Sequence, residues 1–225
     1  MTGCCCKVIC KGCDRANKKR EVERRLAPSC QFCRELLPNT KEEADRLTMK
    51  RVEANDPAAM CQMGGDHFEK GNYSTAFDYF TKAAELGKHD ASVSSAGGLA
   101  IDAEAHYQLS QFYVNGHGVV EKDKRKEIYH LEEASIGGHP YARHNLGCDE
   151  WNNGSKERAV THWIIAATQG FDGSMQLLME AFKEGFVEKD VLAATLRAQK
   201  AAVEATKSPQ RQAAEEWKVN RDRLG

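Results

Sequence analysis

The chain has 225 residues, a formal net charge of −1 at pH 7, 41% hydrophobic residues and a mean hydropathy of −0.62, which is ordinary for a globular protein. Its longest apolar run, Trp163 to Ala167, is far shorter than the about 20 residues that a membrane helix needs, and no secretory leader follows Met1. We therefore expect no membrane partner and a cytoplasmic or nuclear location. Only five prolines occur, which favours helices.

Charge is distributed unevenly along the chain. Residues 1–51 carry 13 lysines and arginines against 7 aspartates and glutamates, whereas the remainder carries 19 against 26. A basic N-terminal part on an acidic body indicates two modules with different roles.

Seven of the nine cysteines lie in the first 33 residues, and we assign residues 1–38 to a cysteine-rich segment. Two Cys-x2-Cys pairs, Cys10 with Cys13 and Cys30 with Cys33, are separated by sixteen residues, a spacing typical of a four-thiolate zinc site. Each pair offers two sulfurs at tetrahedral angles to one metal, at about 2.3 Å. Disulfides are the rival use, but a reducing compartment disfavours them. The sequence therefore predicts zinc as a cofactor.

The stretch from Cys5 to Cys13, the basic helix-like residues 15–26 and the Cys-Gln-Phe-Cys-Arg run at 30–34 together resemble the second half of a RING-type zinc finger. The resemblance implies that Cys30 and Cys33 share one zinc with two of the cysteines at 4–6. It also implies an upstream Cys-x2-Cys pair as partner to Cys10 and Cys13, and that pair is absent here. The predicted ligands are Cys5, Cys6, Cys10, Cys13, Cys30 and Cys33. The alternatives are a single simpler site made by the last four, and S-palmitoylation at residues 4–6.

RING fingers recruit ubiquitin-conjugating enzymes, so the resemblance implies a ubiquitin ligase as one possible function. Arg34 matches the arginine with which many such fingers hold ubiquitin. Two features depart from the pattern: Gln31 replaces the usual proline between the last two cysteines, and the apolar contact residue beside the first pair has no counterpart. We therefore favour a structural zinc segment and keep the ligase as the alternative.

Internal repeats begin after a helical linker at residues 39–55. Three segments end alike, with an alanine three residues before a glycine at Ala84, Ala134 and Ala167. An apolar-aromatic-glycine pattern precedes each of them and also opens a fourth unit. The first residues of these patterns are Met63, Leu109, Leu146 and Leu178. The spacing predicts helix–turn–helix units, each of which must bury its apolar stripe against the next.

These repeats, and above all the run Gly116-His-Gly-Val-Val-Glu-Lys-Asp123, resemble the Sel-one-like repeat, a relative of the tetratricopeptide repeat. The resemblance covers residues 56–208, in units at 56–87, 102–138, 139–171 and 172–208. It implies an all-α solenoid of about four units that scaffolds protein complexes. Residues 88–101 depart from the pattern and are expected to be a flexible inserted loop. Residues 209–225 are expected to form a polar C-terminal helix whose Trp217 packs back onto the chain.

The histidines are best explained as packing residues. His139 and His144 are five residues apart, which is about 140° around a helix, so they do not share a ligand face.

No phosphate-binding or hydrolase motif occurs. The basic stretch at 15–25 lacks interleaved aromatic residues, so we do not expect nucleic acid as a partner. The sequence thus predicts a non-enzymatic adaptor that binds a protein through its repeats, with a RING-type ubiquitin ligase as the alternative.

Overall fold

The computed structural model describes residues 11–87 and 101–224. These residues form eleven α-helices and no strand, apart from one isolated antiparallel bridge between Ser29 and Leu36. The expected all-α class is therefore confirmed. No helix among the described residues is long and apolar enough to cross a membrane.

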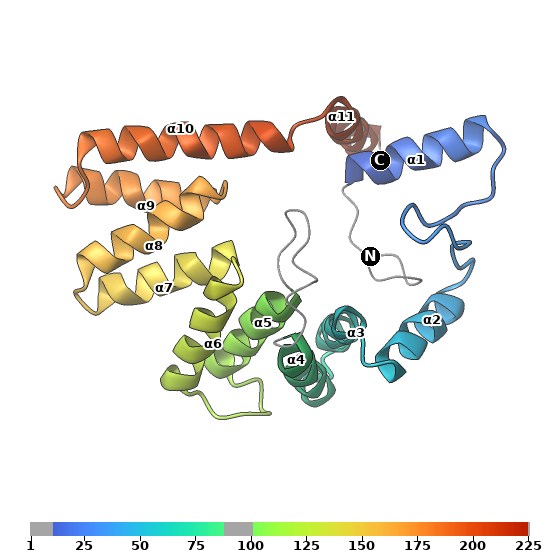
Figure 1. Ribbon diagram of the computed structural model, residues 1–225, viewed down its shortest axis with the longest axis horizontal. Helices are drawn as coiled ribbons and strands as arrows, with labels where there is room; N and C mark the ends of the chain where they lie inside the picture. Colours follow the sequence, from blue (N-terminus) through green and yellow to red (C-terminus); the bar gives the residue numbers. More distant parts are fainter. Residues whose placement is uncertain (1–10, 88–100, 225) are drawn as a thin grey trace. The chain divides into compact units, whose positions relative to one another are not determined.

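The chain divides into two compact units, residues 1–62 with 206–225 and residues 63–205. Figure 1 labels the helices in chain order. They are α1 (Lys11–Glu23), α2 (Lys41–Glu53), α3 (Pro57–Glu69), α4 (Tyr73–Gly87), α5 (Ile101–Asn115), α6 (Lys124–Ile136), α7 (Pro140–Asn152), α8 (Lys156–Thr168), α9 (Asp172–Lys183), α10 (Lys189–Thr206) and α11 (Pro209–Leu224).

The predicted repeats are four consecutive helix pairs, α3 with α4, α5 with α6, α7 with α8, and α9 with α10. Each helix from α4 to α8 packs against the next in sequence, so that successive pairs lie side by side (Figure 1). The first helix of each pair ends near a glycine with positive φ, at 71, 116, 154 and 185, as the repeat pattern predicted. Stacked pairs bury the stripes that a lone hairpin would leave exposed.

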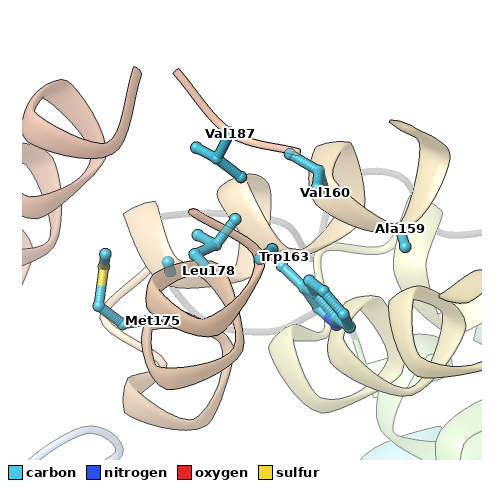
Figure 2. Packing of buried hydrophobic residues seen from close by; sticks show 8 residues of the cluster. Ala159, Val160, Trp163, Met175, Leu178 and Val187 are labelled. Carbon is cyan, nitrogen blue, oxygen red and sulfur yellow. The ribbon is translucent and has the colours of Figure 1, made fainter. Parts of the chain in front are cut away.

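Small residues allow the two helices of a pair to approach closely. The three repeat alanines are buried, and Leu109, Leu146 and Leu178 are at most 5% exposed. A Cβ placed on Gly147 of α7 would lie 2.4 Å from the indole nitrogen of Trp163 in α8. Trp163 belongs to the apolar cluster of α8 and α9 that Figure 2 shows, together with Val160, Leu178 and Val187.

The expected insertion lies where two helix pairs meet. A Cβ on Gly87, the last residue of α4, would lie 2.4 Å from the Cβ of Asp102 in α5, so the two ends of the segment touch. Ile101, which we counted as part of the insertion, is instead the first residue of α5. The other residues of the insertion lie outside the described part of the chain. Because α4 packs directly on α5, the extra residues do not separate the pairs.

The other unit brings together helices from the two ends of the described chain. Helix α1 packs on α11, and a Cβ on Gly12 would lie 2.5 Å from the backbone nitrogen of Arg211. The guanidinium carbon of Arg15 lies 4.6 Å from the centroid of the Trp217 ring, a cation–π contact. The C-terminal tryptophan does pack back onto the chain, and its partner is the first helix.

Candidate functional site

The second cysteine pair lies in a tight turn that follows α1. The backbone N–H of Cys30 donates to the carbonyl oxygen of Glu35 at 2.7 Å, and the N–H of Arg34 donates to that of Cys30 at 2.9 Å. The turn closes through a left-handed residue, because Arg34 has φ of 61°. Cys30 is buried and Cys33 is exposed.

The turn lies against the helix that carries another predicted ligand. The side-chain amide of Gln31 donates to the carbonyl oxygen of Cys13 at 3.3 Å. Three of the predicted ligands therefore lie on neighbouring segments, but no three His, Cys, Asp or Glu side chains of the described residues are arranged to hold a metal. Cys5, Cys6 and Cys10 lie outside the described part. The zinc site stays a prediction.

The predicted ubiquitin-contact residue, Arg34, lines a small open hollow beside this turn. The hollow has a volume of about 240 Å³ and is lined by Asn17, Arg20, Ser29, Cys30, Gln31 and Arg34. Its two arginines make it a basic surface. No contact with ubiquitin is tested by this geometry.

A second candidate lies on the first helices of the repeats, α5, α7 and α9. Leu109, Leu146 and Leu178 occupy equivalent positions in these helices, so each neighbouring position can be compared across the three repeats. Four positions at helical spacing form a stripe on each helix and contain no buried residue. We call the twelve residues of these stripes the first-helix face: Glu104, Tyr107, Gln108 and Gln111 of α5, Tyr141, His144, Asn145 and Cys148 of α7, and Gly173, Gln176, Leu177 and Glu180 of α9.

Aromatic rings connect the three helices across this face. The Tyr107 ring stacks on His139, with centroids 4.2 Å apart and planes 18° apart, and lies 5.9 Å from the Tyr141 ring. Tyr141 meets the edge of Phe171 at 4.6 Å, and His144 lies 5.0 Å from the same ring. We call these five residues the aromatic ladder. Tyr141 is 51% exposed, so the ladder presents a large ring to solvent.

A carboxylate is held at one end of the ladder. Glu104 accepts hydrogen bonds from the amide of Gln108 at 2.7 Å and from Nε2 of His139 at 3.3 Å. The bond from His139 is the main reason that the pKa of Glu104 lies below its ordinary value; burial opposes this effect and Gln108 adds to it. Burial raises the pKa of the Tyr107 hydroxyl, and the nearby charge of Glu104 raises it further.

The hydrogen bonds of His139 fix its tautomer. His139 is the N-cap of α7, and its Nδ1 accepts the backbone N–H of Ala142 at 3.3 Å. An accepting Nδ1 needs a lone pair, so the proton is on Nε2, which donates to Glu104. His139 therefore orients the carboxylate of Glu104.

A Cys–His–Ser group also lies on this face. Nδ1 of His144 is 2.9 Å from the hydroxyl of Ser174, and Nε2 is 3.7 Å from the sulfur of Cys148. Burial lowers the pKa of His144 and raises that of the Cys148 thiol. A nucleophilic cysteine needs a lowered pKa, so this group is better suited to linking α7 with α9 than to attacking a substrate.

The aromatic ladder and Glu104 were not predicted from the sequence. His139 and His144 were predicted to be packing residues, but their contacts with the neighbouring aromatic rings were not. The available signal was the alignment of the repeats on their leucines. That alignment shows unlike residues at the face positions beside like residues at the packing positions.

Comparison with known proteins identifies the repeats. The model of the Sel1 repeat matches residues 57–88 and 103–139. A Sel1 repeat protein from Oxalobacter formigenes has a similar crystal structure, with a TM-score of 0.55, 20% identity, and coverage of 76% of this chain and 68% of that one. An immunity protein from Pseudomonas aeruginosa is also similar, with a TM-score of 0.37, 15% identity, and coverage of 85% and 82%. No curated protein matches the chain.

Proposed function

Because the chain contains Sel1 repeats, we propose that it is a non-enzymatic adaptor that binds a partner protein through the first-helix face. The observation that supports this proposal best is the aromatic ladder, which places the half-exposed ring of Tyr141 between two further rings. Aromatic side chains that are fixed by their neighbours offer large contact area at little entropic cost, and they are enriched at the energetic centres of interfaces.

The face also has the polarity of an interface. Four of its twelve residues are Gln or Asn, whose amides both donate and accept hydrogen bonds. They share the face with the rings of Tyr107 and Tyr141 and offer groups that can pair with a partner's polar atoms. A mixture of aromatic and polar side chains is usual in a specific, reversible interface.

Affinity capture with the full chain tests the proposal, using two variants as a matched pair. Tyr141→Ala removes the exposed ring of the face, and Ile136→Ala removes a still more exposed apolar side chain, 77% against 51% accessible, from the last turn of α6. We expect partners that are captured by the wild type and by Ile136→Ala but not by Tyr141→Ala. Each such partner, once purified, should bind Tyr141→Ala at least about tenfold more weakly, which is the effect of losing a central aromatic contact. Equal affinity for the wild type and Tyr141→Ala would refute the proposal.

We also propose that the N-terminal segment binds zinc through Cys30 and Cys33, with Cys13 and Cys10 as the second pair. The support is the turn at residues 30–34 and the hydrogen bond that holds it against Cys13. Bound zinc would cross-link this turn to α1 and stabilise the segment. Metal analysis of the purified full chain should find at least one zinc per molecule, lost in Cys33→Ser and retained in Cys148→Ser. A metal-free wild-type protein, prepared with zinc present, would contradict it.

The ubiquitin-ligase alternative is tested separately. Arg34 and Arg20 give the turn a basic surface on which an acidic partner could dock. Autoubiquitination assays with a panel of conjugating enzymes would support ligase activity if ubiquitin chains form on the wild type and are lost in Cys33→Ser and in Arg34→Ala. The absence of chains with every enzyme of the panel favours the adaptor.

A further inference from the structure

We infer that the first-helix face takes an extended peptide segment whose lysine or arginine binds Glu104 beside the rings of Tyr107 and Tyr141. The inference rests on the proposed function and specifies the chemistry of the partner. Three features of the face support it: its charge, its rings and its amides.

All formal charge on the face has the same sign. Glu104 and Glu180 are its only charged residues, and none of the twelve positions holds lysine or arginine. The side chain of Glu104 is 41% exposed, and its partners among the described residues are the amide of Gln108 and the ring of His139. A fixed, partly exposed carboxylate that is paired with no lysine or arginine is complementary to a cation supplied by a partner.

The aromatic ladder adds a second attraction for the same group. Tyr107 lies one helical turn after Glu104, close enough for the carboxylate to raise the pKa of its phenol. The ring of Tyr141 lies 5.9 Å from that of Tyr107 and is half exposed. A cation bound to Glu104 would therefore lie near the Tyr107 ring, with Tyr141 beyond it, and cation–π attraction and contact with the aliphatic stem of the cation would both favour binding.

The amides of the face favour an extended backbone over a helix. Gln111, Asn145 and Gln176 place one carboxamide on each of three successive first helices, at different positions relative to the aligned leucines. A carboxamide can donate to a peptide carbonyl and accept from a peptide N–H, but those groups are already paired inside a helical ligand. An extended segment that crosses the repeats presents them unpaired.

Peptide selection followed by a double-mutant cycle tests the inference. A random 12-residue library displayed on phage is selected on the full-length protein, and individual peptides are synthesised with a fluorescent label for anisotropy titration. We expect the selected peptides to be enriched in lysine and arginine. Glu104→Gln should weaken their binding about tenfold, as should replacement of the key cation of the peptide by glutamine or acetyl-lysine. The two changes together should cost little more than either alone, because they remove the same interaction.

Glu132→Gln is the matched control, because it removes the same charge from an exposed position on α6, away from the face. It should leave the affinity within about twofold of the wild type at 0.15 M salt, where distant surface charges are largely screened. An equal loss in Glu132→Gln and Glu104→Gln would overturn the inference, because it would indicate attraction to the acidic body as a whole.

The outcomes separate this inference from the proposed function. If peptides bind in a Tyr141-dependent way but are not enriched in cations, or are insensitive to Glu104→Gln, the inference is wrong and the binding face stands. If Tyr141→Ala changes the affinity of no selected peptide, the proposed function is wrong as well. The peptide replacements do not depend on the folding of any protein variant, so the cation requirement is tested even if Glu104→Gln is unstable.

Discussion

Gly147→Ala should destabilise the repeat unit, although alanine is the better helix former. Gly147 lies in the interior of α7, where its backbone faces the indole of Trp163. An added Cβ would lie 2.4 Å from the indole nitrogen and 3.1 Å from the carbonyl oxygen of Ala159. Trp163 is 2% exposed, and its indole N–H donates to the carbonyl oxygen of His144 at 3.3 Å. The ring must therefore move, and the cluster of α8 and α9 around it leaves little room.

The magnitude follows from opposing contributions. Replacing glycine by alanine inside a helix contributes about 1 kcal/mol of stability. Overpacking a close-packed core costs about 1–3 kcal/mol, and a rigid, buried indole indicates the upper end of that range. Loss of the indole hydrogen bond adds about 1 kcal/mol. We therefore expect a net loss of about 3 kcal/mol in the free energy of unfolding, or a fall of about 10 °C in Tm for a chain of this size.

Thermal unfolding followed by circular dichroism measures this effect, with Gly65→Ala as the control. Gly65 is also helical, but a Cβ there would meet no atom within 4 Å. Its replacement should therefore raise the stability by about 0.5–1 kcal/mol through helix propensity alone. If both substitutions raise Tm equally, close packing at Gly147 does not hold the pair together and the reasoning is refuted.

Three other outcomes follow from the described contacts. Replacing residues 88–100 by two glycines should preserve the helical content and leave Tm within about 5 °C, because Gly87 and Asp102 already touch and a short connection can join them. A loss of cooperative unfolding would contradict this. Glu104→Gln should be less stable than the wild type at pH 7, because the pKa of Glu104 is lowered in the fold and its carboxylate therefore stabilises the fold above the ordinary pKa of 4.5. The difference in Tm between the variant and the wild type should shrink as the pH falls below 4.5. A difference that stays constant with pH would contradict this prediction. Trp217→Ala should increase amide exchange in α1 through loss of the Arg15 contact, whereas unchanged exchange would show that this contact does not stabilise α1.

The fold was predictable because its signals are local and repeated. A helix is specified by spacing within one or two turns, and the leucines, alanines and glycines recur in each unit, so the pairing of helices followed from the pattern. The same recurrence is interrupted at residues 88–101, from which we predicted an insertion; residues 88–100 lie outside the described part of the chain, so the insertion stays a prediction. Its boundary is less well defined, because Ile101 continues the helical pattern of α5.

The aromatic ladder could not be predicted in the same way. The stack of Tyr107 on His139 joins residues that are 32 positions apart, and it depends on how one helix pair is rotated against the next. The spacing of the repeats is also unequal, since Leu109 and Leu146 are 37 residues apart but Leu146 and Leu178 only 32. Register between units is therefore set by packing, which is visible only in three dimensions. The cysteine pairs are the opposite case: their spacing is an evident signal, and the metal they predict is still to be measured.

Comparison of the repeats separates the positions that hold the fold from the positions at which a partner would bind under the proposed function. At the packing positions equivalent residues are nearly alike: leucine occurs three times at 109, 146 and 178, and small residues occur at 105, 142 and 174, all buried. At the face positions they are unlike, as in the set Glu104, Tyr141 and Gly173. Stacking imposes the same steric requirement on every unit, whereas a bound segment meets each unit at a different residue of its own. A chain that keeps its packing positions uniform and varies its face positions has separated stability from specificity, which is what an adaptor built from repeats requires.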